Sequence, residues 1–199
     1  EPFINSAETA LCIGPRFAIL RRGFLEKRAN YLENPRVGPD SVMISFGGSD
    51  LENATCAVLR ELERSENSTQ LSLKVVIGRS YMHEDELAVL VKKSRHQIEV
   101  VKDTDEMDTL LQNISFSIGA AGTSLLERTC ACVPTIIVTV ADNQIEIAKH
   151  YDSTGFGIYL GDIRGLEWKN LLGAAVESLM DPDRLHEKRS ILSGLVDGK

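Results

Sequence analysis

The feature of this sequence that most constrains its fold is a regular alternation of short apolar runs with amphipathic segments. The runs predict buried strands at residues 42–46, 71–77, 97–101, 115–118, 135–140 and 156–160. Continuous apolar strands separated by helices are typical of a parallel sheet that is covered on both faces. Because crossovers between parallel strands are right-handed, the pattern predicts a doubly wound, Rossmann-like α/β fold with a parallel sheet of about six strands.

The segments between these strands have helical spacing. Helices are expected near residues 54–62, 87–91, 107–111, 123–132, 144–151, 168–180 and 183–195. The clearest apolar stripe runs from Trp168 to Met180 and ends at Asp181-Pro182. In doubly wound sheets, ligands bind beyond the carboxyl ends of the strands, where the strand order reverses. We therefore expect a site in the loops that follow the strands.

The chain of 199 residues is long enough to bury one full hydrophobic core. No linker rich in Pro, Gly or Ser interrupts it after residue 40, so residues 39–199 are predicted to form one domain. Residues 1–38 are less regular and are predicted to be an inter-domain connecting segment with the first helix. The first residue is Glu1 rather than Met, which suggests that the sequence begins inside a longer chain or after a removed tag.

Composition argues against several classes of protein. The net charge of -7 disfavours nucleic-acid binding, which rests on a basic surface. No apolar run approaches the roughly 18 residues of a membrane span, and no secretory signal precedes the first strand, so we expect a cytoplasmic protein. An anionic small ligand is still allowed, because helix N-termini and backbone amides hold phosphate without many lysines.

The cysteines do not form a recognisable framework. Cys12, Cys56, Cys130 and Cys132 include no CxxC pair. Cys130 and Cys132 would point to nearly opposite sides of a helix, whereas zinc needs ligands that converge. We predict reduced structural thiols in a reducing compartment, with no metal site and no cofactor.

The first candidate loop holds Gly47, Gly48 and Ser49, directly after the strand at 42–46. Paired glycines permit a positive φ and a close approach of the backbone to a ligand. Ser49 or Asp50 could cap the next helix, and free amides there would suit an anion. A tight turn with a helix cap is the alternative interpretation of this loop.

The second candidate loop runs from Gly119 to Ser124 and opens a helix. Its small residues leave the helix N-terminus uncovered, so Gly122, Thr123 and Ser124 are candidates to bind a pyrophosphate with amides and hydroxyls. Glu127 lies about one turn into the helix, where a carboxylate could accept the hydroxyls of a ribose. The alternative is that Glu127 simply pairs with Arg128 or another neighbour.

The third candidate loop follows the strand at 135–140. Asn143 and Gln144 could hydrogen-bond the hydroxyl or acyl groups of a sugar, unless Asp142 or Asn143 merely caps the next helix. The histidines are scattered, and the sequence has no catalytic Ser-His-Asp order and no Walker loop. A binding crevice is therefore predicted without an evident general base, and no catalytic residue is assigned.

These loops resemble the C-terminal half of GT-B nucleotide-sugar proteins, most closely the PseG-like UDP-sugar hydrolase family of pseudaminic acid and spore-coat polysaccharide biosynthesis. The resemblance lies in CIGPRFAILR (12–21), FGGSD (46–50), AGTSLLE (121–127), VPT (133–135) and ADNQ (141–144). It implies that the Gly47-Gly48 loop and the helix from Gly122 contact phosphate, and that Glu127 holds the ribose. It also implies that Asn143 approaches the sugar.

The resemblance further implies a UDP-sugar as the ligand and an N-terminal domain with a Gly-His loop as the source of the catalytic histidine. This sequence has no such loop, so we expect the chain alone to be inactive. Two alternatives stay open: the donor-binding half of a GT-B glycosyltransferase, and a non-catalytic module fused to a sugar nucleotidyltransferase.

Overall fold

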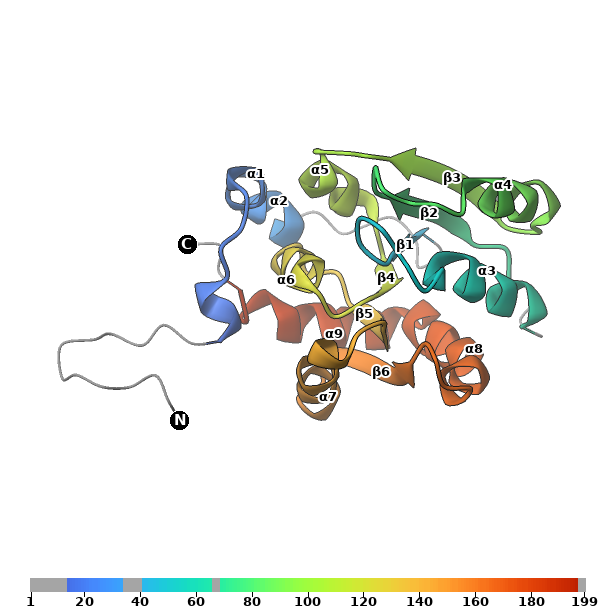
Figure 1. Cartoon of the computed structure of the whole chain (residues 1–199). Helices are drawn as coiled ribbons and strands as arrows, with labels where there is room; N and C mark the ends of the chain where they lie inside the picture. Colours follow the sequence, from blue (N-terminus) through green and yellow to red (C-terminus); the bar gives the residue numbers. More distant parts are fainter. Residues whose placement is uncertain (1–13, 34–40, 66–68, 197–199) are drawn as a thin grey trace.

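The computed structural model describes residues 14–33, 41–65 and 69–196 (Figure 1). Its centre is a six-stranded sheet with the order β3-β2-β1-β4-β5-β6, in which every pairing is parallel. The strands are β1 Ser41–Ser45, β2 Ser72–Ile77, β3 Gln97–Lys102, β4 Phe116–Gly119, β5 Thr135–Thr139 and β6 Gly157–Asp162. The predicted doubly wound, Rossmann-like fold is confirmed.

Helices flank both faces of this sheet (Figure 1). Those before β1 are the short 3-10 helix η1 Pro15–Phe17, α1 Arg22–Glu26 and α2 Arg28–Glu33. The others are α3 Ala54–Arg64, α4 Glu84–Lys93, α5 Met107–Leu110, η2 Leu111–Asn113, α6 Thr123–Cys130, η3 Asp142–Gln144, α7 Ile145–Ser153, α8 Glu167–Met180 and α9 Pro182–Ser193.

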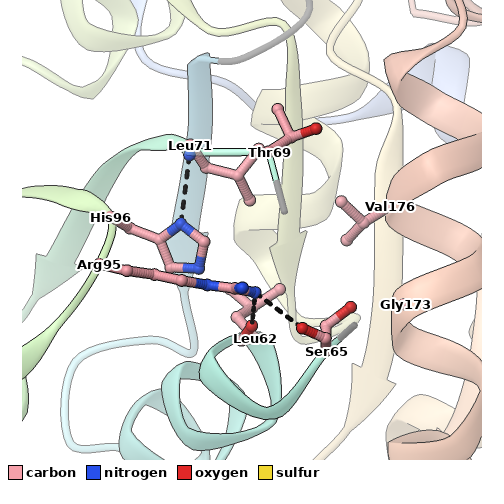
Figure 2. Close-up of a pocket in the computed structure, with 8 residues that line it drawn as sticks. All are labelled: Leu62, Ser65, Thr69, Leu71, Arg95, His96, Gly173 and Val176. Atoms are coloured by element: carbon pink, nitrogen blue, oxygen red, sulfur yellow. Dashed lines mark hydrogen bonds between the residues drawn. The ribbon is translucent and has the colours of Figure 1, made fainter. Parts of the chain in front are cut away.

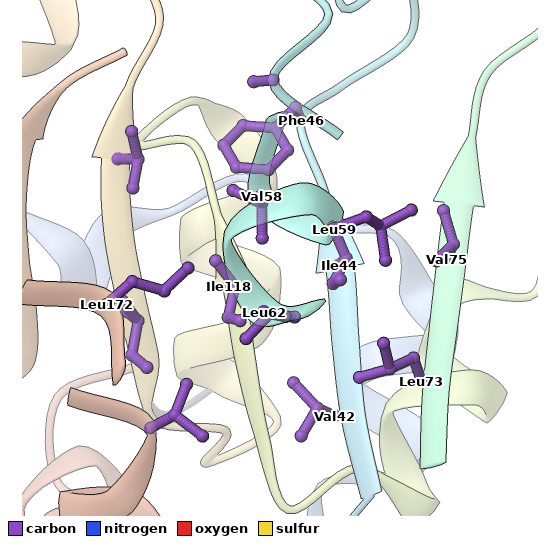
Figure 3. Close-up of a cluster of buried hydrophobic side chains, with 14 of the residues drawn as sticks. Val42, Ile44, Phe46, Val58, Leu59, Leu62, Leu73, Val75, Ile118 and Leu172 are labelled. Carbon is purple, nitrogen blue, oxygen red and sulfur yellow. The ribbon is translucent and has the colours of Figure 1, made fainter. Parts of the chain in front are cut away.

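Alternate residues of the central strands fill two separate hydrophobic layers, as the pleat of a strand requires. Val42 and Ile44 of β1 face the layer that α3, α4 and α8 complete, where Leu59 and Leu172 pack (Figure 3). Met43 faces the opposite layer with Phe24, Tyr31 and Leu111 as neighbours, which are supplied by α1, α2 and η2. Burial of both faces explains why the strands are apolar without alternation.

The segment before β1 packs against the domain rather than standing apart from it. Phe24 and Tyr31 are buried, and the Tyr31 hydroxyl donates to the carbonyl oxygen of Asp108 over 2.7 Å. Lys27 forms a half-buried ion pair with the Asp108 carboxylate. Residues 1–13 and 34–40 lie outside the described residues, so the predicted role of 1–38 as an inter-domain connection stays a prediction.

Cys56, Cys130 and Cys132 are buried, whereas Cys12 lies outside the described residues. Within residues 14–33, 41–65 and 69–196, no helix is both long enough and apolar enough to cross a membrane.

A small cavity lies at the amino-terminal edge of the sheet, between the end of α3 and the starts of β2 and β3 (Figure 2). Its volume is about 10 Å³, which is room for about one water molecule and too small for a ligand. His96 lines it, is 6% exposed, and accepts a hydrogen bond at Nδ1 from the backbone N–H of Leu71 over 3.2 Å. Burial lowers the pKa of His96.

This burial predicts a loss of stability in acid. In the unfolded chain a histidine takes up a proton near pH 6.5, whereas folded His96 resists it, so the stabilisation present above that pH falls as the pH is lowered. His96→Gln keeps an acceptor for Leu71 and removes this titration, so its melting temperature should depend less on pH between 7 and 5. His150→Gln, at an exposed histidine, is the control; equal pH dependence in wild type and His96→Gln would contradict the prediction.

Candidate functional site

The strand order reverses between β1 and β4, and both strands end at the same level there. Ser45, the last residue of β1, is in register with Gly119, the last residue of β4. The loops that follow these two strands therefore begin side by side at the carboxyl edge of the sheet. This is the position at which doubly wound folds bind ligands.

A hollow of about 180 Å³ opens at this edge. Its lining comes from the ends of β1, β2 and β3, their loops, α5 and the start of α6: Ser45, Gly47, Gly48, Val76, Ile77, Gly78, Asp103, Thr104, Met107 and Ser124. A Cβ at Gly78 would overlap the backbone of Gly48, so only glycine at 78 lets the two loops lie this close. Gly47 and Gly48 thus share one hollow with Ser124, as the switch-point argument predicted.

The turn after β1 is an open glycine turn followed by a helix start that the Asp50 side chain satisfies. Gly47 has a φ of 91°, and a Cβ at Gly48 would meet nothing within 4 Å, so the turn is open to solvent. The Asp50 carboxylate is buried and accepts hydrogen bonds from the amides of Ala54 and Thr55 over 2.8 and 2.9 Å. Asp50 therefore occupies the N-terminus of α3. The expectation of free amides at this helix is corrected, and the glycine turn itself is what faces the hollow.

The start of α6 has the opposite character. Gly122 is its N-cap residue, and no side chain caps the helix. Thr123 is exposed, while Ser124 is half-buried at the edge of the hollow. The uncapped first turn therefore carries the positive end of the helix dipole to the surface, in agreement with the small residues that precede it.

Arg128, one turn further along α6, lies beneath this loop. It is 2% exposed, and its guanidinium donates to the carbonyl oxygens of Ala120 and Ser124. A Cβ at Gly119 would overlap both the Arg128 guanidinium and the carbonyl oxygen of Ser45, so this arginine fills the space that glycine leaves. Burial lowers the pKa of Arg128 to about 10.

Sequence reasoning considered Arg128 only as a partner for Glu127 and missed its position. A signal was available, because Arg128 stands on the same helical face as Leu125, which is also buried.

Glu127 pairs with Arg21 and not with Arg128. Its Oε1 accepts from Arg21 Nη2 over 3.1 Å, and the two side chains are 16% and 47% exposed respectively. Arg21 also donates to the Asp105 carbonyl oxygen over 2.8 Å and lies over the ring of Phe24. The half-buried carboxylate is therefore held by the segment that precedes β1.

The loop after β5 brings Gln144 to the second loop. Gln144 Oε1 accepts from the amide of Val140 over 3.1 Å, and its Nε2 would lie 3.9 Å from a Cβ at Gly122. Asn143 beside it is exposed.

The alternative that Asp142 or Asn143 caps the following helix is wrong. The N-cap residue of α7 is Gln144, without a side-chain cap, and Asp142 instead forms an ion pair with Arg164.

No metal cluster accompanies these loops: among the described residues, no three His, Cys, Asp or Glu side chains are grouped to hold an ion. His83, the histidine closest after a strand end, is the N-cap residue of α4 and packs edge-on against Tyr81. The described geometry is that of a hollow bordered by Ser124 at the uncapped start of α6, with the Glu127 carboxylate, held by Arg21, further along the same helix and outside the lining of the hollow.

Comparison with known proteins identifies the family to which the domain belongs. The family model described as the glycosyltransferase family 28 C-terminal domain matches residues 42–194. The chain belongs to this family. The matched range includes all three candidate loops and ends at the close of α9.

Two curated relatives extend the match. The family 28 domain is 28% identical to an uncharacterised protein of Methanocaldococcus jannaschii over 75% of this chain and 31% of that protein. It is 24% identical to the spore coat polysaccharide biosynthesis protein SpsG of Bacillus subtilis over 77% of this chain and 44% of that protein. The chain thus spans less than half the length of these curated relatives.

Solved structures agree on the fold. MurG of Acinetobacter baumannii superposes with a TM-score of 0.71 at 16% identity, over 87% of this chain and 50% of MurG. Os79 from O. sativa, solved in complex with UDP and deoxynivalenol-3-glucoside, gives 0.62 at 18% identity, over 88% of this chain and 42% of Os79. The six-stranded domain therefore has the fold of GT-B glycosyltransferase C-terminal domains.

The packing at Gly119 predicts that this position rejects any side chain. Gly119→Ala forces a methyl group against a buried guanidinium and a backbone carbonyl, which should cost roughly 1–3 kcal/mol of stability. Thermal unfolding should show this as a fall of about 2–4 °C per kcal/mol. Gly122→Ala, whose Cβ lies 3.9 Å from its nearest neighbour, is the matched control and should melt close to wild type. Equal melting temperatures for the two variants would refute the steric explanation.

Proposed function

We propose that this domain binds the nucleoside diphosphate of a UDP-sugar in the crevice between the loops after β1, β4 and β5. The observation that carries the proposal is the uncapped start of α6 at the strand-order reversal, in a chain of the family 28 class. The proposed contacts to phosphate are Gly47, Gly48, Ser49, Gly122, Thr123 and Ser124.

The chemistry of a diphosphate suits these groups. Backbone amides and the helix dipole attract negative charge, and hydroxyls of Thr123 and Ser124 add donors. Glycines at 47 and 48 let an anion approach the backbone, because no Cβ covers it. An acidic protein binds an anion here because the attraction is local, and net charge acts mainly at longer range.

Glu127 is the proposed acceptor for the two ribose hydroxyls. A carboxylate offers about four lone-pair sites, so the bond from Arg21 to Oε1 leaves capacity for a ribose. Two of the similar solved structures are described with nucleoside diphosphates: UDP in Os79, and thymidine diphosphate in the rhamnosyltransferase SpnG. We infer UDP for this chain, with Asn143 and Gln144 next to the sugar.

For the reaction, we infer a UDP-sugar hydrolase of the PseG-like type in bacterial nonulosonic acid biosynthesis, in which a partner domain supplies the catalytic histidine. The ADNQ loop and the relation to the spore-coat protein support this choice. A second candidate, the donor half of a glycosyltransferase, is favoured by the family model and the solved neighbours. UDP release from a UDP-sugar without any acceptor, by the chain joined to such a partner, distinguishes hydrolysis from transfer.

Binding is tested by calorimetric titration of UDP into the 199-residue chain. Wild type should bind, and Gly122→Asp should abolish binding, because it places a carboxylate at the helix start where the diphosphate would lie. Gly122→Ala changes the steric bulk alone and should bind UDP with only a modest loss. Far-UV circular dichroism should be native for all three proteins. If UDP gave no heat with folded wild type, or if Gly122→Asp bound normally, the anion site would be elsewhere.

Glu127 should contribute to binding and not to proton transfer. Glu127→Ala leaves the ribose hydroxyls without a charged acceptor, a loss of roughly 1–3 kcal/mol. Its affinity for UDP should therefore fall about 5- to 150-fold, while its affinity for inorganic pyrophosphate stays nearly constant. In a catalytically complete protein, the same change should raise KM more than it lowers kcat. Equal losses for UDP and pyrophosphate would exclude ribose recognition by Glu127.

A further inference from the structure

Arg128 is a buried cation that contacts no carboxylate among the described residues. Its guanidinium donates to two backbone carbonyl oxygens, those of Ala120 and Ser124, and its Nη1 has no hydrogen-bond partner among the described residues. A buried charge without an ionic partner is costly, and a neutral side chain of similar size would avoid that cost. The position of this charge therefore calls for an explanation beyond packing.

The guanidinium is buried beneath the Gly119–Ser124 loop and bonds to Ser124, which lines the hollow, although Arg128 itself does not line it. Its Nη1 occupies the space beside Gly119 that a Cβ would need, next to the carbonyl oxygen of Ser45. These two residues are the last of β4 and β1, and Ser45 itself lines the hollow. The charge thus lies next to the ends of β1 and β4, where the strand order reverses. The loop from Gly119 to Ser124 separates it from solvent.

The bonds from Arg128 also fix the direction of the loop's peptide groups. The carbonyl of Ala120 points inward to the guanidinium. In a trans peptide the N–H points opposite to the C=O, so the amide of Ala121 points away from Arg128. Carbonyl oxygens, which would repel a phosphate, are thereby kept on the buried side.

We propose that Arg128 is a positioning residue for the diphosphate: it holds the carbonyls of Ala120 and Ser124 inward and supplies a fixed positive charge behind them. This assignment rests on the proposed UDP site. It predicts that Arg128 favours the charged part of the ligand specifically, because a cation acts on the phosphates far more than on an uncharged nucleoside. A role confined to shaping the loop would not require a charge.

The test compares UDP with uridine on four folded proteins by calorimetry. Arg128→Met and Arg128→Gln should each weaken UDP about 10- to 100-fold, the size expected for loss of one charge roughly 6–12 Å away at an effective dielectric of about 20. Uridine affinity should change less than about twofold. Arg128→Lys keeps the charge without the planar fork, and should weaken UDP by less than about tenfold. Gln keeps a donor at the place of Nε, which bonds the Ser124 carbonyl, and removes the charge.

Arg189→Met is the matched control. Arg189 is a half-buried arginine whose guanidinium donates to a backbone carbonyl, that of Ser115, just before the opposite end of β4. Burial lowers the pKa of Arg189 as well. Its replacement should leave the affinities for UDP and uridine unchanged.

The outcomes separate this assignment from the proposed function. If wild type binds UDP and Arg128→Gln binds it equally well, the charge has no role and the assignment fails alone. Parallel loss of UDP and uridine would also overturn it, because that result indicates a distorted loop. If folded wild type binds no UDP, the proposed function fails and the assignment fails with it. Should the neutral variants unfold, Arg128→Lys decides: a loss of UDP affinity below about tenfold supports the assignment, and a larger loss refutes it.

Discussion

The parallel pairing of β1 with β4 is the contact on which the rest of the structure depends. Hydrogen bonds join two strands that are distant in sequence, and the register sets Ser45 level with Gly119. Helical crossovers then leave in opposite directions from this pair, so the sheet grows outward on both sides. Every loop of the candidate site takes its position from that level edge.

Close packing at the edge requires particular residue sizes. Gly78 allows the β2 loop to touch Gly48, and Gly119 makes room for the Arg128 guanidinium. The helix starts at the same edge differ in how their amides are satisfied. The Asp50 side chain accepts from the first amides of α3, while no side chain caps α6. One helix end is therefore complete in the free protein and the other is suited to an external anion.

Sequence patterns predicted the strands, the helices and the class of fold, because burial on both faces imposes a simple rule on which residues form strands. The pattern also indicated that the loops after β1, β4 and β5 would meet, and the hollow and the approach of Gln144 to Gly122 agree with that. Residue roles at the site stay predictions. Long-range side-chain contacts could not be foreseen: the bond from Arg21 to Glu127 joins residues 106 positions apart, and no local periodicity encodes it. The buried place of Arg128 was hidden because charged residues are usually assigned to solvent.

Some positions at this edge are limited by packing and others are exposed, and this difference affects which substitutions the domain can accept. Gly78, Gly119 and Arg128 form a floor in which packing limits residue size: a side chain at Gly78 would overlap the backbone of Gly48, and one at Gly119 would overlap the Arg128 guanidinium. Thr123 and Asn143 form an exposed rim with no such constraint from packing. Substitutions at the rim meet no packing constraint, whereas a side chain at Gly78 or Gly119 requires the neighbouring backbone to move. New ligand preferences are therefore expected to arise at the rim first, on an inherited floor.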